Sequence, residues 1–214
     1  MSMTTLWRGA IALLGWFALS LQLWLMMSNP APPGPALSLL NFFSFFTILT
    51  NILVALSMTF AASPGADGAA GFFKRTSVRT ALTLYIAVVG AVYFLILRHT
   101  WDPQGWQLVA DRLLHYAVPI LALLDWVFVT PKQGLKPAHA LRWLAYPAAY
   151  GAYVLLRGAA DGFYPYPFLD VSALGYGRVL INLAGLVALF AVGGLGFVGL
   201  AKLLSREASS AETA

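Results

Sequence analysis

A threonine and a histidine in two separate apolar segments form the pair of side chains best suited to chemistry in this sequence. Thr47 lies in the segment around residues 39–62 and His115 in the segment around residues 108–130. A hydroxyl beside an imidazole is the minimal arrangement for acyl transfer, because the base removes the hydroxyl proton while the oxygen attacks a carbonyl. The pair therefore predicts a site that cleaves acyl groups, with Thr47 as nucleophile and His115 as general base.

Other polar side chains in the same apolar segments are candidates for support or substrate binding. An asparagine amide could donate hydrogen bonds to an oxyanion or orient the histidine. An arginine near the membrane surface could hold the carboxylate of a fatty acyl substrate. Their purely structural alternatives are hydrogen bonding between helices and contact with lipid headgroups. The supporting candidates are Asn51, Asn182, Gln22, Ser44, Arg98 and Arg157.

The segments that carry these residues are apolar enough to be membrane spans. The 214 residues are 60% hydrophobic and 10% charged, whereas soluble domains carry about 25% charged residues. Stretches of about 20 apolar residues suit transmembrane helices. We expect an all-α integral membrane protein, with a six-helix transmembrane domain over residues 1–204 and a disordered tail over residues 205–214. The expected spans are residues 9–27, 39–62, 80–97, 108–130, 141–157 and 176–200.

The distribution of lysine and arginine predicts the orientation of these spans. With the N-terminus inside, nine basic residues lie in inner segments and four in outer ones. Cytoplasmic loops are enriched in such residues, so we expect both termini in the cytoplasm of a multi-pass protein of the bacterial inner membrane. The same rule accounts for the net charge of +5, so no nucleic-acid partner is implied.

This orientation puts the two reactive residues at one depth. Thr47 falls roughly 12 Å and His115 roughly 10 Å below the outer surface, at 1.5 Å per helical residue. Asp125 comes ten residues after His115, roughly 15 Å deeper. We expect it to pair with Arg142 or Lys132 in a separate inner layer of polar groups.

Three segments resemble a known family of membrane proteins. They are residues 41–51 (NFFSFFTILTN), residues 114–119 (LHYAVP, followed by Asp125 and Trp126) and residues 164–170 (YPYPFLD). In this order they resemble bacterial six-span proteins related to the androgen-induced and androgen-dependent tissue-factor-pathway-inhibitor-regulating proteins of animals. The resemblance implies a hydrolase of fatty acid esters of hydroxy fatty acids, in which Thr47 matches the threonine nucleophile and His115 the histidine.

The sequence indicates no cofactor and no metal. It has no cysteine and only three histidines, and it lacks a glycine-rich phosphate loop. The partners that we expect are the lipid bilayer and a membrane lipid or fatty acyl ester substrate, whereas the sequence does not indicate an oligomeric state. Two alternatives to the hydrolase stay open. One is a transporter or channel-like carrier for a small or lipidic solute, in which ionisable residues within spans would line a pathway. The other is a structural partner without chemistry.

Overall fold

Helices make up all the regular structure in the part of the chain that the computed structural model describes, residues 1–28, 34–65 and 67–212. This confirms the predicted all-α class. The α-helices are α1 (Met3–Met27), α2 (Pro35–Phe42), α3 (Phe46–Ala62), α4 (Gly68–Lys74), α5 (Thr76–Leu95), α6 (Gly105–Arg112), α7 (Val118–Phe128), α8 (Pro137–Trp143), α9 (Ala145–Asp161) and α10 (Val171–Glu212). Shorter elements are the 3-10 turns η1 (Leu97–His99) and η3 (Pro167–Leu169) and the π-helical turn η2 (Leu113–Ala117).

Four of these helical stretches are long and apolar enough to cross a membrane, as judged within the described ranges. They are Met3–Met27, Thr76–His99, Gly105–Phe128 and Val171–Ser205. They contain or largely overlap the first, third, fourth and sixth predicted spans. The predicted fifth span, residues 141–157, is divided between α8 and α9 and is not among the four. Their length and composition are those of membrane-spanning helices.

The predicted second span, residues 39–62, is not one continuous helix. It consists of α2 and α3, which meet at a bend of 68° across a break of a few residues. The bend makes Phe46 the first residue of α3, so Thr47 lies in the first turn of a helix rather than in the middle of one. Counting α2 and α3 as one bent span raises the number of candidate spans to five.

The last helix extends into the segment for which the sequence predicts a disordered tail. Helix α10 continues to Glu212 and contains one non-helical residue, Gly175, with a φ of 73°. Residues 213–214 of the predicted tail lie outside the described residues. The positive φ explains the glycine at position 175, since other residues rarely adopt it.

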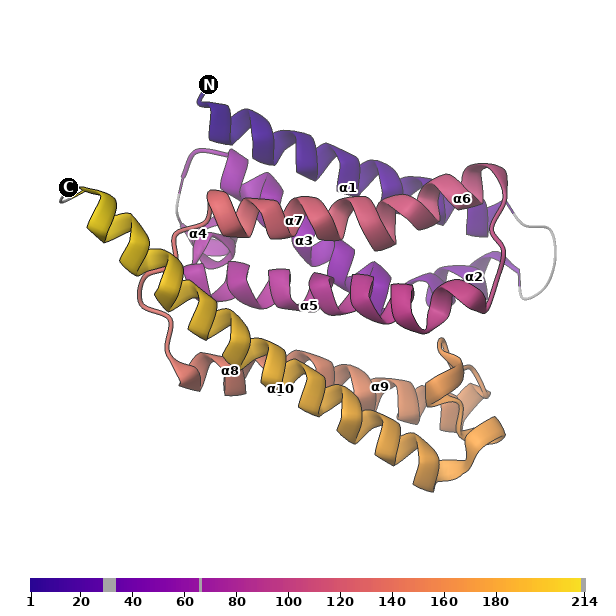
Figure 1. Ribbon diagram of the computed structural model, residues 1–214. Helices are drawn as coiled ribbons and strands as arrows, with labels where there is room; N and C mark the ends of the chain where they lie inside the picture. Colours follow the sequence, from indigo (N-terminus) through magenta and orange to yellow (C-terminus); the bar gives the residue numbers. More distant parts are fainter. Residues whose placement is uncertain (29–33, 66, 213–214) are drawn as a thin grey trace. The chain divides into compact units, whose positions relative to one another are not determined.

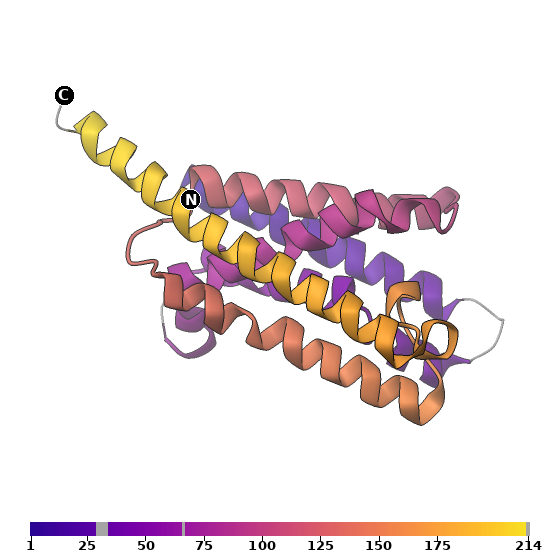
Figure 2. The same ribbon diagram turned by 60° about the horizontal axis from the view of Figure 1, so that its bottom comes forward.

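Contacts divide the chain into two compact units, Met1–Pro131 and Lys132–Ala214, where the sequence predicts one transmembrane domain. In the first unit, α3 packs against both α1 and α5, while α7 packs against α5 and α6 against α1. Figures 1 and 2 show α1, α5 and the α6–α7 stretch running along one another with α3 beside them. One buried cluster in this unit consists of Ala18, Leu19, Phe42, Ile48, Ala55 and Leu114. It joins α1, both parts of the bent span and the π-helical turn.

The second unit is a helical hairpin in which α10 packs against α8, α9 and η3. Small residues allow the close approach: a Cβ at Gly194 would lie 3.1 Å from the Cβ of Ala140, and one at Gly151 would lie 3.2 Å from Leu183 Cδ2. Such contacts are typical of helix packing in membranes, where tight van der Waals contact replaces the hydrophobic effect. Asn182 ties the loop before α10 to the hairpin by donating to the Phe168 carbonyl at 2.8 Å.

Candidate functional site

Asn51 joins the two segments that carry Thr47 and His115. Its side-chain nitrogen donates to the carbonyl of Thr47 at 2.8 Å and to the carbonyl of Leu114, the residue before His115, at 3.3 Å. Asn51 is fully buried and Thr47 is 7% exposed. The nitrogen of this amide thus bonds two carbonyls, one in α3 and one in η2, and links the two elements.

The chain forms a π-helical turn at His115 because a proline follows closely. In η2 the N–H of Val118 donates to the carbonyl of Leu113, five residues earlier. In the same register the carbonyl of Leu114 would need the N–H of Pro119, which proline lacks. The amide of Asn51 supplies the missing donor. Buried carbonyls are rarely left unpaired, so this bond explains both the position of Asn51 and the local shape of the fourth span.

Helix α5 approaches this turn closely at a glycine. A Cβ added at Gly90 would lie 3.2 Å from the carbonyl oxygen of His115 and 3.3 Å from the Cβ of Pro119. Both distances are tighter than ordinary van der Waals contact. The missing side chain at position 90 therefore lets the main chain of His115 pack directly on α5.

His115 is held by two residues that the sequence analysis does not single out, Asp111 and Tyr93. The Nδ1 atom of His115 lies 3.0 Å from the main-chain carbonyl of Asp111, and 3.1 Å from the carboxylate oxygen Oδ1 of the same residue. The first contact has hydrogen-bond geometry. The second is a close polar approach only, and Oδ1 has no hydrogen-bond partner.

Tyr93 on α5 contacts both of these residues. Its hydroxyl donates to Oδ2 of Asp111 at 2.6 Å. Its ring stacks on the imidazole of His115, with centroids 3.9 Å apart and planes inclined by 14°. Asp111 is 3% exposed, whereas 14% of the His115 side chain is exposed. A buried carboxylate and a stacked phenol thus fix an imidazole that keeps some access to its surroundings.

The sequence carries a signal for Asp111 but a weaker one for Tyr93. Asp111 precedes His115 by four residues within one predicted span, and such pairs lie on the same helix face. An ionisable residue within a span is a functional candidate by default. Tyr93 lies in the third span and comes beside His115 only through the packing of α5 against η2.

Two other predicted supporting residues of the first unit, Gln22 and Ser44, make hydrogen bonds elsewhere in that unit. Gln22 on α1 accepts a hydrogen bond from Gln107 on α6 at 2.7 Å. Ser44, in the break between α2 and α3, donates to the carbonyl of Leu40 at 2.7 Å. Each of these bonds joins parts of the helical framework.

The two predicted arginines make different local contacts. Arg98 is exposed, lies over the ring of Phe94 at 3.9 Å and donates to Nε2 of His99 at 3.0 Å. Arg157 belongs to the second unit, together with Asn182. Its side chain is buried, with Nε 3.1 Å from Asp161 Oδ2 and the guanidinium 4.3 Å from the centroid of Phe163.

Asp125 pairs within the first unit with two arginines that the sequence analysis did not expect as partners, whereas the expected partners Arg142 and Lys132 belong to the second unit. Its carboxylate lies between two other arginines, with Oδ1 3.0 Å from Arg8 Nε and Oδ2 bonded to Arg79 Nη2. Thr130 also donates to Oδ2 at 2.8 Å. Helix packing explains these partners, because α7, which carries Asp125, packs against both α1 and α5, which carry the two arginines. The cluster Arg8–Asp125–Arg79 is a polar cluster of the first unit with two arginines around one carboxylate.

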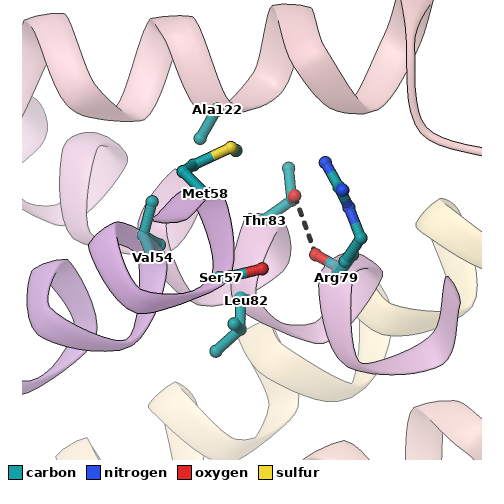
Figure 3. A pocket seen from close by; sticks show the side chains of 7 residues that line it. All are labelled: Val54, Ser57, Met58, Arg79, Leu82, Thr83 and Ala122. Carbon is teal, nitrogen blue, oxygen red and sulfur yellow. Dashed lines mark hydrogen bonds between the residues drawn. The ribbon is translucent and has the colours of Figure 1, made fainter. Parts of the chain in front are cut away.

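A small cavity adjoins this cluster. It has a volume of about 10 Å³ and is lined by Val54, Ser57, Met58, Arg79, Leu82, Thr83 and Ala122. Figure 3 shows the Arg79 side chain at its edge and the hydrogen bond from the Thr83 hydroxyl to the Arg79 carbonyl, 2.9 Å long. A space of this size holds about one water molecule. It is therefore too small for an organic solute.

No group of three histidine, aspartate or glutamate side chains is arranged to hold a metal ion within residues 1–28, 34–65 and 67–212. A scan against protein-family models gives no match to the chain. Searches of curated proteins and of solved structures give none either. The function must therefore be inferred from the arrangement of Thr47, Asn51 and His115 and from the motifs around them.

Proposed function

We propose that this protein is an intramembrane hydrolase of lipid esters, with Thr47 as nucleophile and His115 as general base. The observation that carries the proposal is the amide of Asn51, which bonds the carbonyl of Thr47 and the carbonyl next to His115. Thr47 and the residue beside His115, 67 positions apart in the sequence, are thereby tied to one amide group. These bonds hold the main chains of the two segments near each other, and acyl transfer needs a nucleophile and a base that are held close together.

The reaction proceeds in two steps. In the first, the Thr47 oxygen attacks the ester carbonyl while His115 takes its proton; the alcohol then leaves with that proton, and the acyl group stays on Thr47. In the second, water attacks the acyl-threonine, again losing a proton to His115, and the fatty acid is released as Thr47 regains its hydrogen. One ester and one water thus yield one acid and one alcohol, and the imidazole ends unchanged.

The break before α3 supports the role of Thr47. The N–H groups in the first turn of an α-helix have no carbonyl partner within that helix, and the helix dipole is positive at this end. Thr47 is the second residue of α3. A carbonyl oxygen that becomes negative during attack by Thr47 would therefore form near an N-terminus that stabilises negative charge.

The membrane setting supports a lipid substrate. We propose that the bent pair α2–α3 and the α8–α9 stretch complete six spans, with both termini in the cytoplasm of a bacterium and the protein in its inner membrane. The positive charge of the predicted inner loops supports this orientation. The resemblance of residues 41–51 and 114–119 to animal hydrolases of hydroxy fatty acid esters supports an ester of a long-chain acid as substrate.

Purified protein in detergent, treated with a fluorophosphonate probe and with a fatty acid ester of a hydroxy fatty acid, tests the proposal. We expect covalent labelling at Thr47 and release of free fatty acid. Thr47→Val and His115→Ala should each abolish both signals, whereas Thr47→Ser should retain part of them because it keeps a hydroxyl. Thr83→Val is the matched control, since Thr83 bonds its own helix at the Arg79 carbonyl.

Labelling and turnover that persist in Thr47→Val and His115→Ala would refute the assignment. Uptake of a solute into proteoliposomes, without cleavage of any ester, would instead favour a carrier.

A further inference from the structure

A buried carboxylate lies against His115 without any role in the chemistry described so far. Asp111 is 97% shielded from solvent, and its carboxylate oxygens contact Tyr93 and His115. Burying a carboxylate is costly unless hydrogen bonds or a positive charge compensate it. Tyr93 supplies one hydrogen bond, to Oδ2, and Oδ1 has none. An imidazolium at His115, 3.1 Å from Oδ1, would supply a compensating charge.

The same contacts determine which nitrogen of the imidazole carries the proton. Nδ1 makes its hydrogen bond with the main-chain carbonyl of Asp111, which can only accept. A neutral imidazole has one N–H and one lone-pair nitrogen. With the proton on Nδ1, Nε2 is the nitrogen with the lone pair, and it is the one able to act as a base.

We propose that Asp111 is a positioning residue for His115, and that Tyr93 holds Asp111 in place for this task. The main-chain carbonyl and the nearby carboxylate of Asp111 together favour a proton on Nδ1, and the carboxylate compensates the imidazolium that forms when Nε2 takes a proton. The stacked ring of Tyr93 fixes the plane of the imidazole while its hydroxyl anchors Oδ2. The catalytic consequence rests on the proposed function, whereas the arrangement of the three side chains does not.

The tautomer of His115 can be measured without any substrate. Uniform ¹⁵N labelling of histidine gives signals from His99, His115 and His139 only, and the signal lost in His115→Gln assigns the one of interest. For the wild type we expect the pattern of an Nδ1–H imidazole. In Asp111→Asn the new amide brings N–H donors to within reach of Nδ1, so we expect the Nε2–H form to gain population.

The rate of probe labelling at Thr47 provides the second measurement. A wrong tautomer removes the base, so Asp111→Asn should slow labelling by on the order of 10²- to 10⁴-fold, and it should lower kcat for ester cleavage with little change in KM. Tyr93→Phe keeps the stacked ring and loses one hydrogen bond, so we expect about a 3- to 10-fold slower reaction. Asp102→Asn, at an exposed carboxylate before α6, is the matched control and should change nothing.

Three results overturn the proposal: an Nε2–H tautomer in the wild type, an unchanged tautomer in Asp111→Asn, or labelling within about twofold of wild type in both Asp111→Asn and Tyr93→Phe. If Asp111→Asn does not fold, the ¹⁵N spectrum of His115 and the rate of probe labelling at Thr47, both measured in Tyr93→Phe, test the proposal in its place. A wild type that never reacts with the probe, but whose tautomer responds to Asp111→Asn, would refute the proposed hydrolase and leave the positioning of His115 by Asp111 intact.

Discussion

Asn51 on α3 donates a hydrogen bond to the carbonyl of Leu114 in the π-helical turn, across 63 positions of sequence. Pro119 has no N–H to donate to that carbonyl, so the side-chain amide of Asn51 on the neighbouring helix supplies the donor. One side chain thus compensates a local defect of the fourth span and fixes the distance between α3 and His115. The stability of the turn and the geometry of the candidate site depend on the same bond.

Replacing Asn51 with leucine should therefore loosen the fold and the site together. The substitution keeps the branched shape of the side chain, with somewhat larger volume, but leaves the Leu114 carbonyl unpaired, at a cost of about 1–3 kcal/mol in the free energy of unfolding. We also expect the rate of probe labelling at Thr47 to fall by at least about 10-fold, because a reaction slows when the reacting groups are misplaced. Thermal unfolding in detergent and labelling kinetics measure the two effects.

Asn182→Leu is the control for this variant, because Asn182 donates to a carbonyl in the other unit. It should lower stability without slowing labelling. Equal losses of labelling in both variants would show that Asn51 acts only through general stability.

Gly90 should resist even the smallest substitution. In Gly90→Ala the new methyl group would press on the His115 carbonyl and on Pro119, at 3.2 and 3.3 Å. Overpacking of this kind typically costs about 1–3 kcal/mol, and here it would also displace the main chain of His115. We expect a lower unfolding temperature together with slower labelling.

Gly9→Ala provides the comparison, since apart from its own helix backbone and chain neighbours nothing lies within 4 Å of a Cβ at that glycine. It should stabilise α1 by about 0.5–1 kcal/mol, because alanine has the higher helix propensity. If the two alanine variants behave alike, close packing on η2 is not what selects glycine at position 90.

Much of the framework could be predicted from hydropathy, because long apolar stretches have few stable alternatives in a membrane. Hydropathy predicts the helices around residues 9–27, 80–97, 108–130 and 176–200. The bend before Thr47 was not, since residues 43–45 are as apolar as their neighbours and no proline or glycine marks the break.

The candidate site could be predicted only where spacing along one helix carries the information. Asn51 and Thr47 are one turn apart, and so are Asp111 and His115, so each pair is readable from the sequence. Tyr93, and the choice of Arg8 and Arg79 as partners of Asp125, depend on which helices pack together. Basic residues are common at several span ends, so charge alone could not select those two from Arg142 and Lys132.

Neutralising Asp125 should destabilise the first unit strongly. In Asp125→Asn the neutral amide no longer compensates the positive charges of Arg8 and Arg79. The Arg79 side chain is only 5% exposed, so water compensates its charge poorly. Breaking a buried ion pair by removing one partner costs about 3–5 kcal/mol. Chemical unfolding in detergent should show a loss of this size, while Asp102→Asn should show almost none.

Adding Arg8→Met to Asp125→Asn should restore part of this stability, because it removes one of the two uncompensated cations. A double variant less stable than Asp125→Asn alone would mean that the Arg8 side chain contributes chiefly by packing.

The loop after α9 should lose structure in acid through Asp161. The Phe163 main-chain N–H donates to this carboxylate at 2.9 Å, and with Arg157 it lowers the pKa of Asp161 below its usual value. Because the folded pKa lies below the unfolded value of about 3.9, the stabilisation is complete above that value and is lost as the pH falls through the folded pKa. We expect amide exchange at Phe163 to lose protection, relative to the intrinsic rate, as the pH drops below about 4.

Asp161→Asn isolates this effect, because it cannot titrate while Asp170 still can. The protection of Phe163 should then be low and independent of pH over the same range. A wild-type protection factor that stays constant through acid would assign the stability of the loop to the contact between Arg157 and Phe163 rather than to the charge of Asp161. An equal pH dependence in Asp161→Asn would assign the loss of protection to another acid, such as Asp170.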